Sequence, residues 1–386
     1  MNHISIGLDV RMIRHTGIGT YLRGLLEGFD SAQIAGDFRP VLFGSPGPGI
    51  GKNRNTRHSG SPEGAKNSGL KDFTAPIYSI REQLAYPKHL SRCKVWHAPH
   101  YNVPVMKGRT KLVVTIHDII HWIFRKQFLN PAQMAYAGFM LRRAVTSSDH
   151  ILAVSGNTKR DLIEHFRAPA EKITVTYEGV GRDHVRIPPE ELITRFAALR
   201  EKYRLPEDFF LYVGLLKPHK NVHWLAGIVR SLKASGRLRS SLVLVGRKDK
   251  KYPKGWEGLR NLATDKDVIH LPGVEFDELL VLYNRAVALV HPSLYEGFGL
   301  TVLEAMKCGT PVITTRAASL AEVAGDAAIL VDPKDPREMS ETLIRVESDA
   351  KTREALRAKG FERVRRFDWA ETARRTAAVY EKVLRS

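Results

Sequence analysis

The sequence predicts an α/β protein of two doubly wound domains, each a parallel sheet covered by helices on both faces. Short apolar runs alternate with amphipathic stretches of helix length, as expected for parallel strands that are buried on both faces. The alternation stops near residues 178–208 and then starts again. A chain of 386 residues also exceeds one ordinary hydrophobic core, so two domains are expected.

The first domain is expected to cover residues 1–180. Its strands are expected at residues 4–8, 40–43, 95–97, 112–116 and 151–154, and its helices at 21–29, 131–146 and 157–166. Residues 45–72 are rich in Gly, Ser, Pro, Asn and Lys and contain scarcely any large apolar residue. This composition predicts a mobile insertion, either a simple surface loop or a segment with a role in acceptor or membrane contact.

The second domain is expected to cover residues 181–366. Its strands are expected at residues 209–213, 242–245, 268–271, 287–290, 312–314 and 328–331. After it, residues 367–384 have the apolar spacing of a single amphipathic helix.

The net charge of +19 predicts attraction to polyanions, such as nucleic acid, anionic lipid headgroups or phosphorylated small molecules. Nucleic acid is disfavoured, because the sequence has no recognisable reading element such as a zinc finger or RNP aromatics. No apolar run approaches the roughly 18 residues of a membrane span, and no signal peptide pattern precedes the first strand. Cys93 and Cys308 stand too far apart in sequence to indicate a disulfide framework or a zinc site. We therefore expect a cytoplasmic protein.

The most informative stretch lies between the strands expected at residues 287–290 and 312–314. It contains Glu296-Gly-Phe-Gly-Leu-Thr-Val-Leu-Glu304, which predicts a glycine-bearing loop followed by a short helix. Backbone N–H groups at a helix N-terminus attract phosphate, and carboxylates accept hydrogen bonds from sugar or ribose hydroxyls. The stretch therefore suits a nucleoside diphosphate sugar. The candidate binding residues between the two glutamates are Gly297, Phe298, Gly299, Leu300, Thr301 and Val302.

This stretch, Pro-Ser-x-x-Glu-Gly-Phe-Gly-Leu followed by Glu-Ala-Met-x-x-Gly-Thr-Pro-Val, resembles the donor-site signature of the retaining glycosyltransferases of family four. An ordinary βαβ unit with surface glutamates is the alternative, but the match runs over about twenty consecutive positions. The resemblance implies the GT-B architecture, two facing Rossmann-like domains with a C-terminal helix that returns to the first domain. It also implies that Glu304 holds the ribose hydroxyls, and that Glu296 is a catalytic residue that holds the hydroxyls of the transferred sugar.

Two further candidate sites lie in the first domain. Gly17 and Gly19 form a turn that enters the first expected helix, where the backbone can approach a ligand closely. The turn is similar to the family's loop beneath the donor diphosphate, although a tight βα connection is an alternative. His117 ends the strand at residues 112–116, at the edge where α/β sheets bind ligands. The resemblance implies that His117 is a catalytic group that contacts the transferred sugar; its alternative role is to cap the strand through backbone bonds.

Positive charge for a diphosphate is expected at the start of the second domain. Gly214 follows a strand there, and Lys217 and Lys220 precede a helix. The family commonly has an arginine soon after this glycine, where this sequence has Leu215, so Lys217 or Arg247 is left to supply the missing charge. No Asp-x-Asp motif follows a predicted strand, so we expect no cofactor and no obligatory metal ion.

Together these features predict a cytoplasmic retaining glycosyltransferase that moves a hexose from a nucleoside diphosphate sugar to a glycan or lipid-linked acceptor. The sequence resembles bacterial enzymes of surface polysaccharide assembly, among which GDP-mannose is a frequent donor, so mannose is the first sugar expected. Two alternatives stay open: an inactive relative that binds polyanions or membranes, and a different nucleotide-sugar enzyme on the same fold. Peripheral binding to an anionic membrane is expected at residues 134–141, an apolar stretch flanked by Arg125, Lys126, Arg142 and Arg143.

Overall fold

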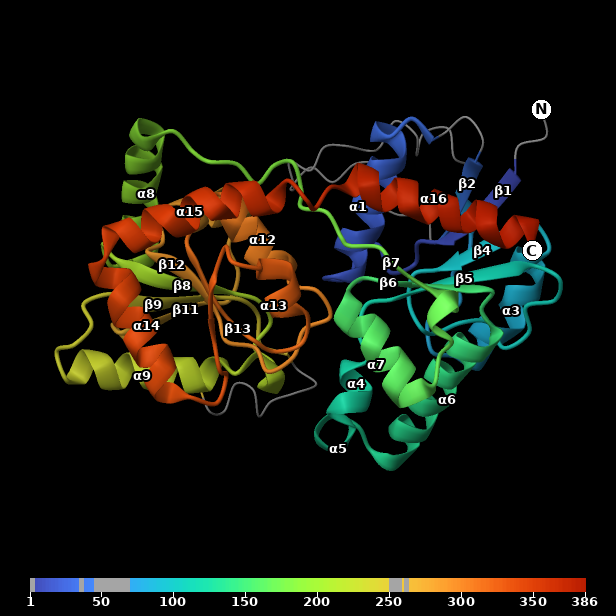
Figure 1. Ribbon diagram of the computed structural model, residues 1–386, viewed down its shortest axis with the longest axis horizontal. Helices are drawn as coiled ribbons and strands as arrows, with labels where there is room; N and C mark the ends of the chain where they lie inside the picture. Colours follow the sequence, from blue (N-terminus) through green and yellow to red (C-terminus); the bar gives the residue numbers. More distant parts are fainter. Residues whose placement is uncertain (1–3, 35–37, 45–69, 250–258, 260–263) are drawn as a thin grey trace. The chain divides into compact units, whose positions relative to one another are not determined.

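The computed structural model describes residues 4–34, 38–44, 70–249, 259 and 264–386, and the chain divides into two compact units (Figure 1). Unit 1 contains Met1–Gly179 and Phe367–Ser386, and unit 2 contains Val180–Arg366. Of the predicted insertion, residues 45–69 lie outside the described residues. At its end the prediction is wrong, because Lys71–Asp72 form a short edge strand, β3.

Unit 1 is built on a seven-stranded sheet with the order β3-β2-β1-β4-β5-β6-β7, in which all neighbours are parallel. The five predicted strands are confirmed within two residues at each end. They and the unpredicted β7, which has three residues, are β1 (Ile4–Asp9), β2 (Phe38–Gly44), β4 (Val95–Ala98), β5 (Lys111–Ile116), β6 (His150–Ala153) and β7 (Ile173–Val175).

Helices cover both faces of this sheet. Neighbouring residues of a strand point to opposite faces, so Val113 and Val114 of β5 belong to two different hydrophobic clusters. One cluster is completed by α1 (Ile18–Ser31) and α16 (Trp369–Arg385). The other is completed by α3 (Ile80–Leu90), α6 (Pro131–Ser147) and α7 (Gly156–Phe166), and the short helices α4 (Ile120–Ile123) and α5 (Arg125–Phe128) precede α6.

Local signals explain where the predicted helices begin. At the start of α6, Asn130 and Gln133 form a capping box in which each side chain accepts from the other's backbone N–H group. Pro131, at the first helical position, has no N–H group that would need a partner. Ser155 caps α7 by accepting a hydrogen bond of 3.0 Å from the N–H of Thr158.

Unit 2 repeats this plan with the strand order β10-β11-β9-β8-β12-β13-β14, in which only β10 is antiparallel to its neighbour. The six predicted strands are confirmed. The strands are β8 (Phe209–Val213), β9 (Ser241–Val245), β10 (Thr264–Asp265), β11 (Val268–Leu271), β12 (Ala288–His291), β13 (Val312–Thr315) and β14 (Ile329–Val331). The helices are α8 (Pro189–Tyr203), α9 (Val222–Ala234), α11 (Phe276–Arg285), α12 (Leu300–Lys307), α13 (Ser319–Ala324), α14 (Pro336–Ser348) and α15 (Ala350–Val364).

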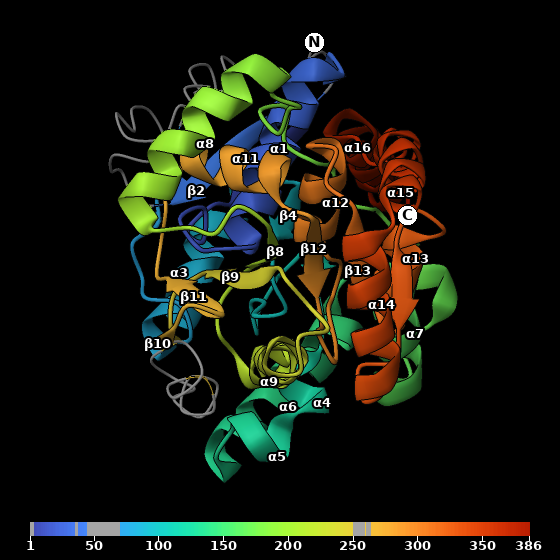
Figure 2. The same cartoon turned by 90° about the vertical axis from the view of Figure 1, so that its left-hand side faces the viewer.

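The strand order of each sheet indicates at which edge of the sheet a ligand would bind. Figure 2 shows α9 and α11 on opposite sides of the strands of unit 2, so both faces of that sheet are covered. The order reverses between β1 and β4 in unit 1 and between β8 and β12 in unit 2. Open α/β sheets bind ligands beyond the carboxyl ends of their strands at such a reversal.

The C-terminal helix packs on α1 within unit 1, which confirms the predicted return to the first domain. Trp369, the first residue of α16, fits against two glycines of α1. A Cβ atom on Gly24 would lie 2.0 Å from the Trp369 ring, and a Cβ atom on Gly28 would lie 2.1 Å from the Trp369 carbonyl oxygen. The close contact between the two helices therefore depends on the absence of a side chain at Gly24 and Gly28 of α1.

Replacing Gly24 with Ala should lower the free energy of unfolding by about 1–3 kcal/mol, because the added methyl group displaces Trp369. Gly227 of α9 is a matched control, since a Cβ atom there meets nothing within 4 Å. Gly227→Ala should raise stability by about 0.5–1 kcal/mol, as expected for Gly→Ala inside a helix. Thermal and urea unfolding of both variants would check the contrast. Equal effects would contradict the proposed packing.

Candidate active site

The turn between β12 and α12 leaves the N-terminus of α12 without a side-chain cap. Gly299 precedes the helix with a φ of 114°, a conformation that residues with a side chain rarely adopt. Ser319 of α13 donates hydrogen bonds to the carbonyl oxygens of Glu296 (2.9 Å) and Phe298 (2.8 Å), which holds the turn in place. The first N–H groups of α12 have no acceptor within the helix, so this end of α12 suits an anion.

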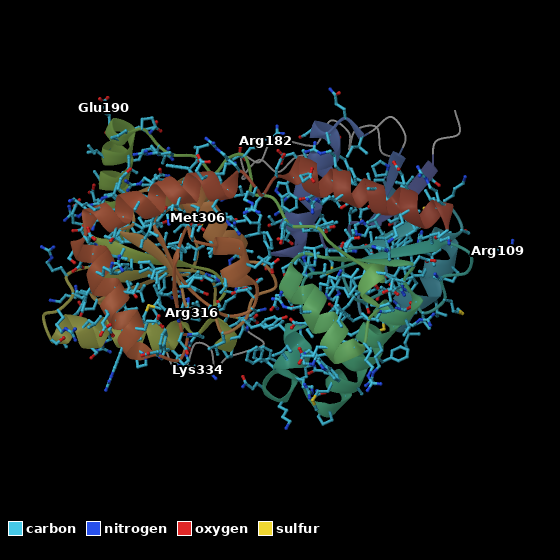
Figure 3. All side chains as sticks on the ribbon, in the orientation of Figure 1. Arg109, Arg182, Glu190, Met306, Arg316 and Lys334 are labelled. Atoms are coloured by element: carbon cyan, nitrogen blue, oxygen red, sulfur yellow. The ribbon has the colours of Figure 1, made fainter. Side chains whose placement is uncertain are left out.

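The other predicted residues of this turn divide between the helix end and the core. Leu300 and Thr301 are partly exposed at the helix start, whereas Gly297 is buried. Val302 lies in the core, and its N–H group already donates to the Gly299 carbonyl oxygen. Phosphate binding by the Val302 backbone stays a prediction, and in this structure its N–H group is already paired. Met306, labelled in Figure 3, continues the buried face of α12.

Glu296 forms an ion pair with Lys220 at the reversal of the sheet. Lys220 ends the 3₁₀ helix Pro218–Lys220 after β8, and its Nζ donates a hydrogen bond of 2.5 Å to Glu296 Oε1. His291 Nε2 (2.9 Å) and Ser293 Oγ (2.6 Å) donate to the same oxygen. The sequence assigned Lys220 to the diphosphate and Glu296 to the sugar as separate groups. The pairing of β8 with β12 brings them together.

The charge of Lys220 decides the state of this carboxylate. Burial by itself would raise the pKa of Glu296, but the Lys220 ammonium and the hydrogen bond from His291 outweigh it and hold that pKa well below its usual range. Glu296 is therefore ionised at neutral pH. Because its folded-state pKa is lowered, its contribution to stability is present above the pKa of an unfolded glutamate and is lost as the pH falls through the folded-state value.

Glu304 lies on α12, where two side chains from outside the motif surround it. Tyr283 of α11 donates a hydrogen bond of 3.0 Å to Glu304 Oε2, and His184 Nε2 lies 3.8 Å from Oε1. Burial raises the pKa of Tyr283 well above its usual range, so the phenol keeps the proton that it donates. The sequence did not reveal either partner, because both lie far from Glu304 in the chain and belong to no local motif.

The predicted phosphate residues after β8 and β9 lie side by side. A Cβ atom on Gly246 would lie 1.8 Å from the Gly214 carbonyl oxygen, so the two strand ends approach closely. Lys217 Nζ lies 3.6 Å from Asp249 Oδ2, an interaction that offsets part of its charge. Arg247 is exposed beside it. Of the two residues expected to replace the missing arginine, Arg247 is the more exposed.

In unit 1, the start of α1 and the end of β5 lie together. Gly17 precedes α1 with a φ of 76°. A Cβ atom on Gly19 would lie 2.4 Å from the Ile13 carbonyl oxygen, so the turn has no room for a side chain there. The ring of Tyr21, on α1, packs edge-on against the ring of His117, with centroids 4.9 Å apart. The structure thus brings the predicted glycine turn and the predicted histidine to one place.

Both ring nitrogens of His117 contact oxygen atoms of unit 1. Nε2 lies 3.0 Å from the Pro99 carbonyl oxygen, a backbone contact of the kind that the alternative role of His117 requires. Nδ1 lies 3.0 Å from Glu178 Oε1. Glu178 was not predicted, because it is 61 residues from His117 and no motif contains the two.

Comparison with known proteins agrees with a two-unit enzyme of the GT-B architecture. Residues 16–184 match the family model described as "Glycosyltransferase Family 4", and residues 196–363 match "Glycosyl transferases group 1". The chain is 30% identical over 289 residues to O-antigen chain mannosyltransferase B of Escherichia coli, covering 74% of each chain. It is 29% identical over 284 residues to O-antigen chain mannosyltransferase RfbU of Salmonella typhimurium, covering 73% of each. The chain therefore belongs to glycosyltransferase family 4 and is a glycosyltransferase.

Solved structures share the fold across almost the whole chain. Alr3699/HepE from Anabaena, solved in complex with UDP-glucose, has a TM-score of 0.73 at 18% identity and covers 98% of this chain and 100% of its own. WaaG, a glycosyltransferase involved in lipopolysaccharide biosynthesis, has a TM-score of 0.69 at 17% identity and covers 97% of this chain and 99% of its own. At these identities the likeness concerns the fold, and it confirms the predicted fold class.

Replacing Lys220 with Met should lower the free energy of unfolding by about 3–5 kcal/mol, because Glu296 is then left buried without its cation. Adding Glu296→Gln should restore most of this loss, since the unpaired charge is removed. The exposed pair of Lys359 and Asp326 is the control, and Lys359→Met should change stability far less. Thermal unfolding at neutral pH would measure all four proteins. A double variant that is no more stable than Lys220→Met would contradict a coupled pair.

Proposed function

We propose that this protein transfers a hexose, with retention of configuration, from a nucleoside diphosphate sugar to a hydroxyl group of a glycan or lipid-linked acceptor. Mannose from GDP-mannose is the first sugar proposed, because relatives that cover 74% and 73% of the chain are named O-antigen mannosyltransferases. The reaction would belong to surface polysaccharide assembly in the cytoplasm. The observation that carries the proposal is the Lys220–Glu296 pair beside the uncapped end of α12, with Glu304 on the same helix.

The diphosphate is proposed to lie at the N-terminus of α12. Its departure from the sugar requires that developing negative charge be stabilised, and donors aimed at the phosphate oxygens supply this. The free N–H groups of α12 and the Lys220 ammonium are the proposed donors. Leu215 occupies the position where the family commonly has an arginine. Arg247, exposed at the end of the neighbouring strand, is proposed to supply the missing positive charge. We propose that these groups neutralise the diphosphate without an obligatory metal ion.

The two glutamates are proposed to bind the two sugars of the donor, the ribose and the transferred hexose. Tyr283 holds Oε2 of Glu304, and a carboxylate oxygen can accept more than one hydrogen bond, so Glu304 can still receive the ribose hydroxyls. The three donors on Glu296 converge on Oε1, so we propose that Oε2 receives a hydroxyl of the transferred hexose. His117 is proposed to act on that hexose as its anomeric carbon gains positive character.

We propose no protein nucleophile for this reaction. Retention would then follow from attack on the same face that the diphosphate leaves, through a state with ion-pair character. The leaving phosphate would take the proton of the acceptor hydroxyl, which balances the transfer. The role of the protein would be to orient the donor and stabilise charge.

Calorimetric titration with GDP-mannose, UDP-glucose and ADP-glucose tests the proposal at the donor site before an acceptor is known. Glu304→Ala should weaken binding of the nucleotide sugar by roughly 1.5–3 kcal/mol, the value of a hydrogen bond to a charged group. Glu341→Ala, at an exposed glutamate of α14, is the control and should leave affinity unchanged. If no nucleotide sugar binds, the proposed function is wrong. If Glu304→Ala binds like wild type, only the ribose assignment is wrong.

An exposed apolar patch on unit 1 supports a membrane-associated acceptor. Its members lie on or beside α3 and α6: Tyr78, Ile80, Leu84, Met106, Tyr136 and Phe139. The rings of Tyr78 and Tyr136 lie 6.2 Å apart, and Gln83 of α3 accepts a hydrogen bond of 2.8 Å from the N–H of Val105, so the elements are neighbours. Among the described residues, no helix has the length and apolar character needed to cross a bilayer.

The patch overlaps the surface expected at residues 134–141 at Tyr136 and Phe139 and extends it to residues of α3. Met140 and Leu141 of this stretch face the core, so only part of it is exposed. Arg143 and Arg125 donate hydrogen bonds to the backbone at Val105 and Trp122, whereas Arg142 is exposed. Arg81, Lys88 and Arg109 add exposed positive charge near or on α3, and Figure 3 shows Arg109 at the edge of unit 1. We propose that this patch docks on an anionic membrane.

Leu84→Glu should reduce binding to vesicles that contain phosphatidylglycerol, because it places a negative charge in the apolar patch. Ile193→Glu in unit 2 is the matched control, since Leu84 and Ile193 are both 71% exposed. Flotation at low and high salt, with phosphatidylcholine vesicles for comparison, would measure the effect, and added salt should weaken binding. Equal binding of both variants, or no binding by the wild type, would contradict membrane docking through this patch.

A further inference from the structure

Unit 1 buries a carboxylate that the proposed function does not use. Glu178 follows β7, and its side chain is only 5% exposed. A carboxylate is costly to bury unless a charged or hydrogen-bonding partner compensates for the lost water. In the described part of the chain that partner is His117, whose Nδ1 lies 3.0 Å from Glu178 Oε1. The two side chains therefore form a pair.

The second ring nitrogen of His117 shows where the hydrogens lie. Nε2 is 3.0 Å from the Pro99 carbonyl oxygen, which can only accept, so Nε2 carries a hydrogen. The contact at Nδ1 then requires another hydrogen, which belongs either to an imidazolium or to the carboxyl group of Glu178. In both cases the ring is held at both nitrogens, and the ring of Tyr21 packs against it in a T-shaped contact.

The backbone on both sides of Glu178 is fixed by the C-terminal helix. Thr372 Oγ1, on α16, donates a hydrogen bond of 2.6 Å to the Tyr177 carbonyl oxygen. On the other side, a Cβ atom on Gly179 would lie 2.4 Å from the backbone nitrogen of Trp369, so this residue fits against the start of α16. The helix thus holds Glu178 where its side chain reaches His117.

We propose that Glu178 is a positioning residue for His117, which fixes the orientation of the imidazole ring and offsets the positive charge of its imidazolium form. The inference rests on the proposed action of His117 on the transferred hexose. A lone imidazolium would oppose positive charge that develops at the anomeric carbon, whereas a pair with no net charge would oppose it far less. Glu178 therefore affects turnover through His117 and not through the nucleotide.

The test compares Glu178→Gln, His117→Ala and the double variant. Glutamine keeps the size and a hydrogen-bond acceptor but removes the charge. For each protein, kcat and KM are measured for hydrolysis of GDP-mannose, or of the nucleotide sugar that binds in its place, together with Tm. Glu178→Gln should lower kcat roughly 10- to 100-fold with KM unchanged. The double variant should be no slower than His117→Ala, because the two residues act together.

Glu371→Gln, at a half-exposed glutamate of α16, is the control and should keep wild-type kcat. If Glu178→Gln does not fold, Thr372→Val replaces it, since this change removes the bond to Tyr177 and leaves the pair intact; kcat should fall by a smaller factor at unchanged KM. If these Glu178 or Thr372 variants keep wild-type kcat while His117→Ala has a lowered kcat, the inference about Glu178 is wrong, and the proposed role of His117 stands. Wild-type kcat in His117→Ala would overturn the proposed role of His117 itself.

Discussion

The ion pair between Lys220 and Glu296 is the interaction on which the site of unit 2 depends. Glu296 can stay ionised while buried because Lys220, His291 and Ser293 all donate to it. An ammonium group has three N–H donors, so Lys220 can hold Glu296 and a phosphate oxygen together. The pair would then link the grip on the diphosphate to the grip on the sugar. This link is available only because β8 and β12 are neighbours in the sheet.

Unit 1 also buries a carboxylate, and other residues compensate for its burial. Glu178 is buried and pairs with His117, at the end of β5, within a sheet of the same doubly wound type. In each unit a carboxylate that would be costly to bury is compensated by a nitrogen-bearing side chain from the end of another strand of the sheet, and Glu296 also accepts from His291 and Ser293. The difference lies in the partner. Lysine supplies a fixed charge, whereas histidine can share a hydrogen with the carboxyl group, so the two pairs suit different tasks.

The strands and site residues that could be predicted from the sequence are those that a local pattern of residues encodes. Apolar runs revealed most strands, but β3 and β10, with two residues each, are too short to show a pattern. The three-residue β7 was missed, although β14, of the same length, was predicted. The Glu296–Glu304 motif and the glycines at 17 and 19 were found because their chemistry lies in consecutive residues. Tyr283 and Glu178 were not, because a polar partner from a distant element leaves no local signal. The apolar stretch at residues 134–141 located only part of the exposed apolar surface, since its spacing did not separate the core-facing Met140 from the exposed Phe139.

The C-terminal helix explains how stability and site geometry are joined in unit 1. Trp369 contacts glycines of α1 on one side and Gly179 on the other, so a single aromatic residue meets two segments far apart in sequence. One of these segments carries Glu178. A change that loosens Trp369 should therefore weaken the core and also release the backbone that aims Glu178 at His117. The helix thus completes the core of unit 1 and supports the side-chain pair at the carboxyl ends of its strands, which gives a physical reason for the chain to return to this unit.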